Sequence, residues 1–68
     1  MNDADIDIAC RLHERAVAAR AEGKFAEAES LGLQALKLLE KTEGPEHPDV
    51  VTARNNLACV YEEVARGR

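Results

Sequence analysis

The sequence predicts an all-α fold of three antiparallel helices. Glycine and proline, which most often interrupt secondary structure, are few: the 68 residues contain four glycines and two prolines. The segments between them are rich in Ala, Leu, Glu, Arg and Lys, which are good helix formers. No segment alternates apolar and polar residues for long enough to indicate a strand. We therefore expect helices at 5–22, 24–42 and 48–66 and a loop at 43–47, within a single domain that spans residues 1–68.

The first helix is predicted from one apolar stripe. Apolar residues recur at spacings of four, four and three, namely Ile8, Leu12, Ala16 and Ala19. This spacing places them on one face of a helix. Gly23 is expected to end the helix in a left-handed conformation. Because only Gly23 and Lys24 separate this helical pattern from the next, the first two helices must form a hairpin.

The second helix is predicted to be buried on two sides. Its main apolar stripe has spacings of three, four, three and four, namely Phe25, Ala28, Gly32, Ala35 and Leu39. Further leucines broaden this stripe over most of the helix, as is typical of a helix between two neighbours. Gly32 costs about 1 kcal/mol relative to alanine. A close approach of the first helix at its small alanines would explain this glycine.

The third helix follows a loop that two prolines make stiff. Gly44 is expected to end the second helix, and Pro48 suits the first position of the third. An apolar stripe follows, namely Val50, Ala53, Leu57, Val60 or Tyr61, and Val64. His47 lies between the prolines, and neither a nucleophile nor a carboxylate pair accompanies it in the sequence. We expect His47 to cap or pack against a helix rather than to act as a catalytic base.

Composition and charge argue against several classes of function. A net charge of −4 disfavours a nucleic-acid partner and a small DNA-binding helix-turn-helix protein. No apolar run reaches the roughly 20 residues that span a membrane, and no secretory signal opens the chain. One Phe, one Tyr and no Trp leave too little bulk to enclose a catalytic pocket, so we expect neither an enzyme nor a cofactor. Two cysteines do not make a disulfide framework, which favours a cytoplasmic protein with reduced thiols.

Two segments carry the motifs of a known repeat. The first is Gly23-Lys24-Phe25-Ala26-Glu27-Ala28-Glu29, followed by Gln34-Ala35-Leu36. The second runs from Gly44-Pro45-Glu46-His47-Pro48-Asp49-Val50 to Asn55-Asn56-Leu57-Ala58. Together they cover about residues 10–62 and resemble tetratricopeptide repeats of the 42-residue, kinesin light chain-like type. The resemblance implies a solenoid of helical hairpins with about one and a half repeats, that is, one complete repeat and the first helix of a second.

The resemblance also implies a binding groove. In this family the first helix of each repeat lines a concave groove that binds peptides. Carried over to this sequence, the groove residues are Cys10, His13, Val17, Arg20, Thr52, Asn55, Cys59 and Glu62. Asn55 suits this role because its amide both donates and accepts hydrogen bonds, and so can hold a peptide backbone.

No other predicted helix of the chain buries the apolar stripe of the third helix. Solenoid repeats cannot bury their apolar faces alone. We therefore expect a homo-oligomer, most simply a two-fold dimer. Its predicted interface is Leu57, Val60, Tyr61 and Val64. The alternative is that the chain is a piece of a longer repeat array.

A metal- or redox-responsive regulator is the alternative function. Cys10 and His13 are three residues apart, so they share a helix face and form half of a zinc site. Cys59 could approach from the third helix, with Glu14 or a partner chain completing the site. The competing interpretation, which we favour, is that both cysteines are small, semi-buried apolar residues and that no metal is bound.

Overall fold

The computed structural model describes residues 3–67 and confirms the all-α fold of three helices. Helix α1 spans Asp3–Ala21, α2 spans Phe25–Glu43 and α3 spans Pro48–Gly67. These bounds differ from the predicted ones by at most two residues. In the described part of the chain, no helix is long and apolar enough to cross a membrane.

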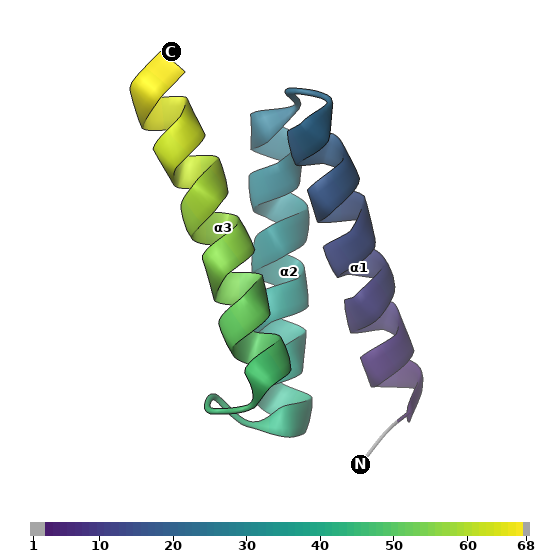
Figure 1. Cartoon of the computed structure of the whole chain (residues 1–68). Coiled ribbons are helices and arrows are strands. Elements are labelled where there is room, and N and C mark those ends of the chain that lie inside the picture. Colours follow the sequence, from purple (N-terminus) through teal and green to yellow (C-terminus); the bar gives the residue numbers. More distant parts are fainter. Residues whose placement is uncertain (1–2, 68) are drawn as a thin grey trace.

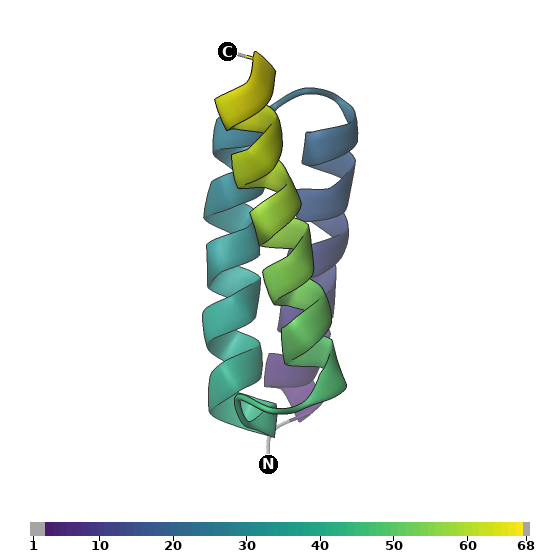
Figure 2. The same ribbon diagram turned by 60° about the vertical axis from the view of Figure 1, so that its left-hand side comes forward.

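The helices form an elongated body in which α2 packs against both of its neighbours (Figure 1). Its extents are 40 × 19 × 13 Å. Helices α1 and α3 run in the same direction and barely touch each other, because α2 lies between and behind them (Figure 2). This arrangement leaves one face of the molecule on which α1 and α3 stand side by side.

Gly23 ends α1 in the predicted left-handed conformation, with φ of 81°. The Gly23 N–H donates to the Arg20 carbonyl at 3.0 Å, and the Lys24 N–H donates to the Ala19 carbonyl at 2.9 Å. These two bonds form a Schellman motif, which satisfies carbonyls that the helix end would otherwise leave free. The tight turn lets α2 begin at Phe25, so the hairpin is short.

Small residues let the helices approach closely. Ala16, Ala28 and Ala35 are fully buried. Near the loop between α2 and α3, one core cluster joins all three helices through Ala9, Leu39, Val50 and Ala53. At the hairpin end, a second cluster consists of Ala19, Ala28 and Val60, with Phe25 packed against it. Each cluster takes a residue from every helix, so the three helices share one continuous fold.

The explanation predicted for Gly32 is wrong. A Cβ atom added at Gly32 would lie 3.3 Å from Cδ1 of Leu57, which belongs to α3. The glycine therefore makes room for a leucine of α3 and not for an alanine of α1. The helix period gave the buried position of Gly32 but could not say which neighbour fills the space.

Two residues of the predicted dimer interface are buried within the fold of the single chain. Leu57 is 6% exposed and Val60 is fully buried. Leu57 reaches Gly32 of α2, and Val60 packs in the cluster with Ala28. These contacts correct the prediction for both residues, because α2 already covers them. Tyr61 and Val64 remain open, with exposures of 46% and 41%.

Candidate functional site

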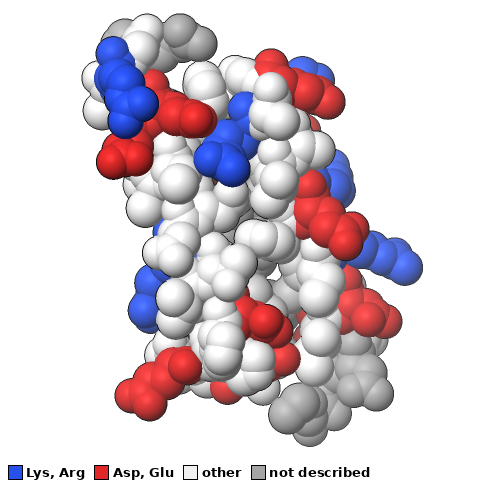
Figure 3. Space-filling model, in the orientation of Figure 1, with Lys and Arg blue, Asp and Glu red and all other residues white. Residues whose placement is uncertain are grey.

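A hollow of about 180 Å³ lies between α1 and α3 near the α2–α3 loop, where the peptide groove is predicted. The residues that line this hollow are Ala9, Cys10, His13 and Glu14 from α1, Leu39 from α2, and Asp49 and Thr52 from α3. Figure 3 shows this face, where uncharged surface fills the space between the two helices and charged groups stand around it.

The predicted groove residues form two rows, one on α1 and one on α3, whose members lie at matching heights along the two parallel helices. With an offset of 42 residues, Cys10 pairs with Thr52, and each later member of the α1 row pairs with the corresponding member of the α3 row. Cys10, His13 and Thr52 line the hollow, whereas the other five predicted residues lie outside its lining. Most of the set is exposed, namely Cys10, Val17, Thr52, Asn55 and Glu62, and the half-buried members are His13, Arg20 and Cys59.

Two buried donors are left without a hydrogen-bond acceptor among the described residues. They are Nε of Arg20 on α1 and Nδ2 of Asn56 on α3. Asn56 is 9% exposed, unlike its exposed neighbour Asn55. A buried donor with no acceptor lowers stability, by about 1–3 kcal/mol. Both atoms are inaccessible from outside, so a ligand could reach them only after their side chains move.

Glu14, Leu39 and Asp49 line the hollow and were missed by sequence reasoning. Leu39 was assigned to the core stripe, and it is indeed 4% exposed. Its side chain nevertheless forms the floor of the hollow.

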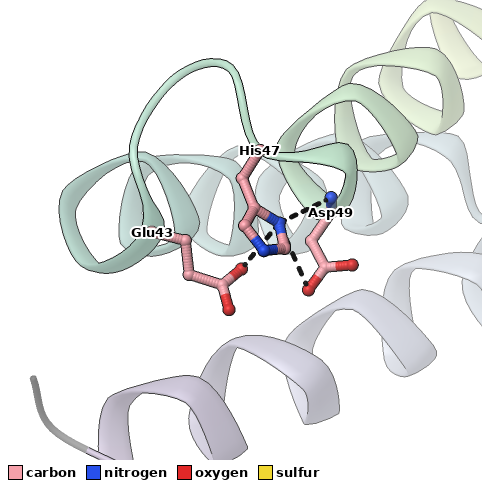
Figure 4. A group of neighbouring side chains, drawn as sticks. All are labelled: Glu43, His47 and Asp49. Carbon is pink, nitrogen blue, oxygen red and sulfur yellow. Dashed lines mark hydrogen bonds and ion pairs between the residues drawn. The ribbon is translucent and has the colours of Figure 1, made fainter.

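His47 caps the start of α3, as expected for a helix-capping or packing role. Its Nδ1 accepts a hydrogen bond from the backbone N–H of Asp49 at 3.1 Å (Figure 4). Oε1 of Glu43 lies 3.4 Å and Oδ2 of Asp49 lies 3.8 Å from the same nitrogen. In the described part of the chain, these three side chains are the group whose ligand-type atoms all fall within 4.8 Å. The lone pair of Nδ1 is engaged by the backbone N–H, so in this geometry the histidine acts as a cap.

Replacing the capping side chain tests this role. We expect His47→Ala to lower the free energy of unfolding by about 0.5–2 kcal/mol, the usual cost of losing an N-cap. His47→Asn keeps a side-chain acceptor at the cap, so its stability should stay within about 0.5 kcal/mol of the wild type. Urea unfolding followed by circular dichroism measures both values. An equal loss of unfolding free energy in the two variants would show that His47 stabilises the chain through packing of its imidazole and not through the cap.

The metal or redox site that Cys10, His13 and Cys59 would form in the alternative function does not assemble. Their ligand atoms do not form a group within 4.8 Å of one another among residues 3–67. The repeat offset explains why, because Cys59 is level with Val17, seven residues beyond Cys10. Seven residues correspond to about 10 Å along a helix. Both cysteines are free thiols.

Comparison with known proteins identifies the fold. A family model described as "Tetratricopeptide repeat" matches residues 7–66, which is most of the chain. The chain belongs to the tetratricopeptide repeat family. Neither the curated proteins nor the solved structures contain a match to it. Tetratricopeptide repeats are in general non-enzymatic scaffolds for protein–protein interaction.

Packing at the hairpin end has the features of a tetratricopeptide repeat. Phe25 begins α2 and contacts the cluster that includes Ala19 of α1 and Val60 of α3, so it fills the space between adjoining repeats. The Tyr61 hydroxyl donates a hydrogen bond to the Glu29 carboxylate of α2. Desolvation, this bond and the negative charge of Glu29 all raise the pKa of Tyr61. Its ring is thereby held in place while much of it stays exposed.

Proposed function

We propose that the chain is a protein-interaction module that binds a peptide in the groove between α1 and α3. The hollow next to the α2–α3 loop is the observation that supports this function. It lies on the face that lines the groove in tetratricopeptide repeats, and three of the predicted groove residues line it, namely Cys10, His13 and Thr52.

The hollow suits a peptide side chain with an apolar stem and a cationic end. The surface that lines the hollow is mostly apolar, and Ala9 and Leu39 are among its lining residues. Glu14 and Asp49 are exposed carboxylates at its walls. Lysine and arginine bury their aliphatic stems on apolar surface and keep the charged end in a polar environment. A Lys or Arg of the peptide therefore fits both parts of the hollow.

Donors along the groove suit a peptide backbone. Asn55 is exposed on α3 and can donate to one peptide carbonyl and accept from one peptide N–H. Two groove helices offer a small footprint, so we expect weak binding unless two grooves act together.

Selection from a random peptide library displayed on phage tests the groove. We expect enriched peptides to contain Lys or Arg, and we expect Asn55→Ala to weaken their binding by about 1–2 kcal/mol, or roughly 5- to 30-fold. Isothermal titration calorimetry with the synthesised peptide gives the affinities. Gln34→Ala is the matched control, because Gln34 is an exposed amide on α2, outside the hollow lining. Equal effects of the two substitutions would contradict binding in the groove.

We also propose that the chain self-associates through the outer face of α3. Val51 and Tyr61 are each more than two-fifths exposed and lie about 80° apart around the helix, on its outer face. Tyr61 and Val64 are the two members of the predicted interface that α2 leaves open, but Val64 lies about 140° from Val51 around the helix and so outside this face. Sedimentation equilibrium of the untagged chain is expected to show a dimer that dissociates on dilution. The free thiols are in keeping with the reducing, cytoplasmic setting that we propose for this module.

A further inference from the structure

The outer face of α3 repeats the pattern by which α1 packs against α2. On α1, the residues Ala9, Ala16 and Ala19 are at most 3% exposed. Forty-two residues later, their equivalents on α3 are Val51, Ala58 and Tyr61, and all three are exposed. The positions that are buried by helix packing on α1 are therefore exposed at the equivalent places on α3.

Resting on the self-association proposed above, we infer that two copies pack α3 against α3 in antiparallel orientation, with Ala58 of each copy at the two-fold axis. Ala58 is a small residue at the middle of this face, where it permits two helix backbones to approach closely. It also lies at the centre of Pro48–Gly67, so an axis there overlaps the full length of both helices. A two-fold axis makes the interface isologous, so the face must complement itself.

Arg54 and Tyr61 are placed on this face so that a two-fold axis at Ala58 brings them together across the interface. Arg54 and Tyr61 lie about 40° and 60° from Ala58 around the helix, in the same direction. Both sit on the side of α2, since Arg54 pairs with Glu40 at 3.3 Å and Tyr61 bonds to Glu29. Arg54 precedes Ala58 by four residues and Tyr61 follows it by three. An antiparallel two-fold pairing therefore brings Arg54 level with Tyr61 of the partner subunit.

That juxtaposition is favourable on two counts. The guanidinium can stack on the ring of Tyr61 of the partner subunit, a cation–π contact. It also approaches the carboxylate of Glu29 of the partner subunit, because Tyr61 and Glu29 are hydrogen-bonded. The two copies of Arg54 themselves are about 12 Å apart along the helix direction, so they repel little. Val51 of each copy meets Ala65 of the partner subunit at the ends of the contact.

The opposite edge of the interface adjoins the peptide groove. Asn55 and Glu62 lie about 60° and 40° from Ala58 in the other direction, on the groove side of α3. The two grooves of the dimer therefore border the same interface. A single partner that enters both grooves would bind more tightly than one that enters either alone.

Charge reversal tests the orientation. Sedimentation equilibrium is run on the full chain and its variants. Arg54→Glu is expected to weaken the dimer at least about fivefold, because the axis doubles each change. Adding Glu29→Lys to Arg54→Glu should recover most of the loss, since opposite charges again meet across the axis. Glu40→Gln is the control, because it removes the intrachain partner of Arg54 without changing the proposed contact.

A charge at the axis tests the register. Ala58→Arg is expected to weaken the dimer at least about tenfold, since it places two like charges at the closest approach. Ala18→Arg makes the same change at an exposed alanine of α1 and should leave the dimer intact. Circular dichroism checks that each variant keeps its helices. A dimer that withstands both Ala58→Arg and Arg54→Glu would overturn the helix pairing but leave self-association standing. A wild-type chain that is monomeric at every concentration would overturn both.

Discussion

Leu39→Ala is expected to lower the free energy of unfolding by about 2–5 kcal/mol, the usual range for a leucine lost from a core. Leu39 is 4% exposed and belongs to the cluster that joins α1 to α3 through Ala9, Val50 and Ala53. A chain of this length has a total stability of about 3–10 kcal/mol. The substitution therefore removes a large share of it, and we expect the variant to be partly unfolded at room temperature. Urea unfolding at a fixed protein concentration measures the change, since association adds to apparent stability.

Ile8→Ala is the control for this loss. Ile8 of α1 is 48% exposed and lies outside the proposed dimer contact, so its truncation leaves no internal cavity and should cost less than about 0.5 kcal/mol. A small effect of Leu39→Ala, comparable to that of Ile8→Ala, would mean that the three helices do not share the core described above.

Ala28→Leu is expected to destabilise the chain by about 1–3 kcal/mol or more, through overpacking. Ala28 is fully buried between Ala19 of α1 and Val60 of α3, where a larger side chain has no room. Relief of the clash would move α1 or α3 away from α2, and the groove would change shape. Thermal unfolding followed by circular dichroism gives the loss of stability.

Ala26→Leu provides a matched comparison on the same helix. Ala26 is exposed, and leucine is nearly as good a helix former as alanine, so stability should change by less than about 0.5 kcal/mol. Equal stability of the two leucine variants would contradict the close helix crossing at Ala28.

The ends of the helices could be predicted from single residues. Gly23 predicted the left-handed end of α1, and Pro48 marked the first residue of α3. Both signals act through backbone conformation, which neighbouring residues in the sequence determine. The burial of the small alanines was likewise predictable, because Ala16, Ala28 and Ala35 belong to the apolar stripes and all three are fully buried.

Contacts between helices were less accessible from the sequence. An apolar stripe says that a helix is covered but not by what, so Leu57 and Val60 were assigned to a dimer although α2 covers them. Gly32 was assigned to the wrong neighbour for the same reason. The spacing of Cys10 and His13 predicts only that the two lie on the same face of one helix. Whether Cys59 comes near them depends on the register between α1 and α3, which the spacing does not give. The hollow was missed because residues of all three helices line it, and their relative placement is not encoded in any one segment.

The most direct test of the proposed function is to map a library-selected peptide onto the ¹⁵N-labelled chain by NMR. Peptide binding is predicted to shift the amide signals of His13 and Thr52 beside the hollow and of Asn55 along the groove. The signals of Gln34 and Lys37 are predicted to stay in place, because these exposed residues of α2 lie outside the hollow lining. Failure to enrich any peptide, or shifts concentrated at Gln34 and Lys37, would contradict a peptide-binding groove between α1 and α3.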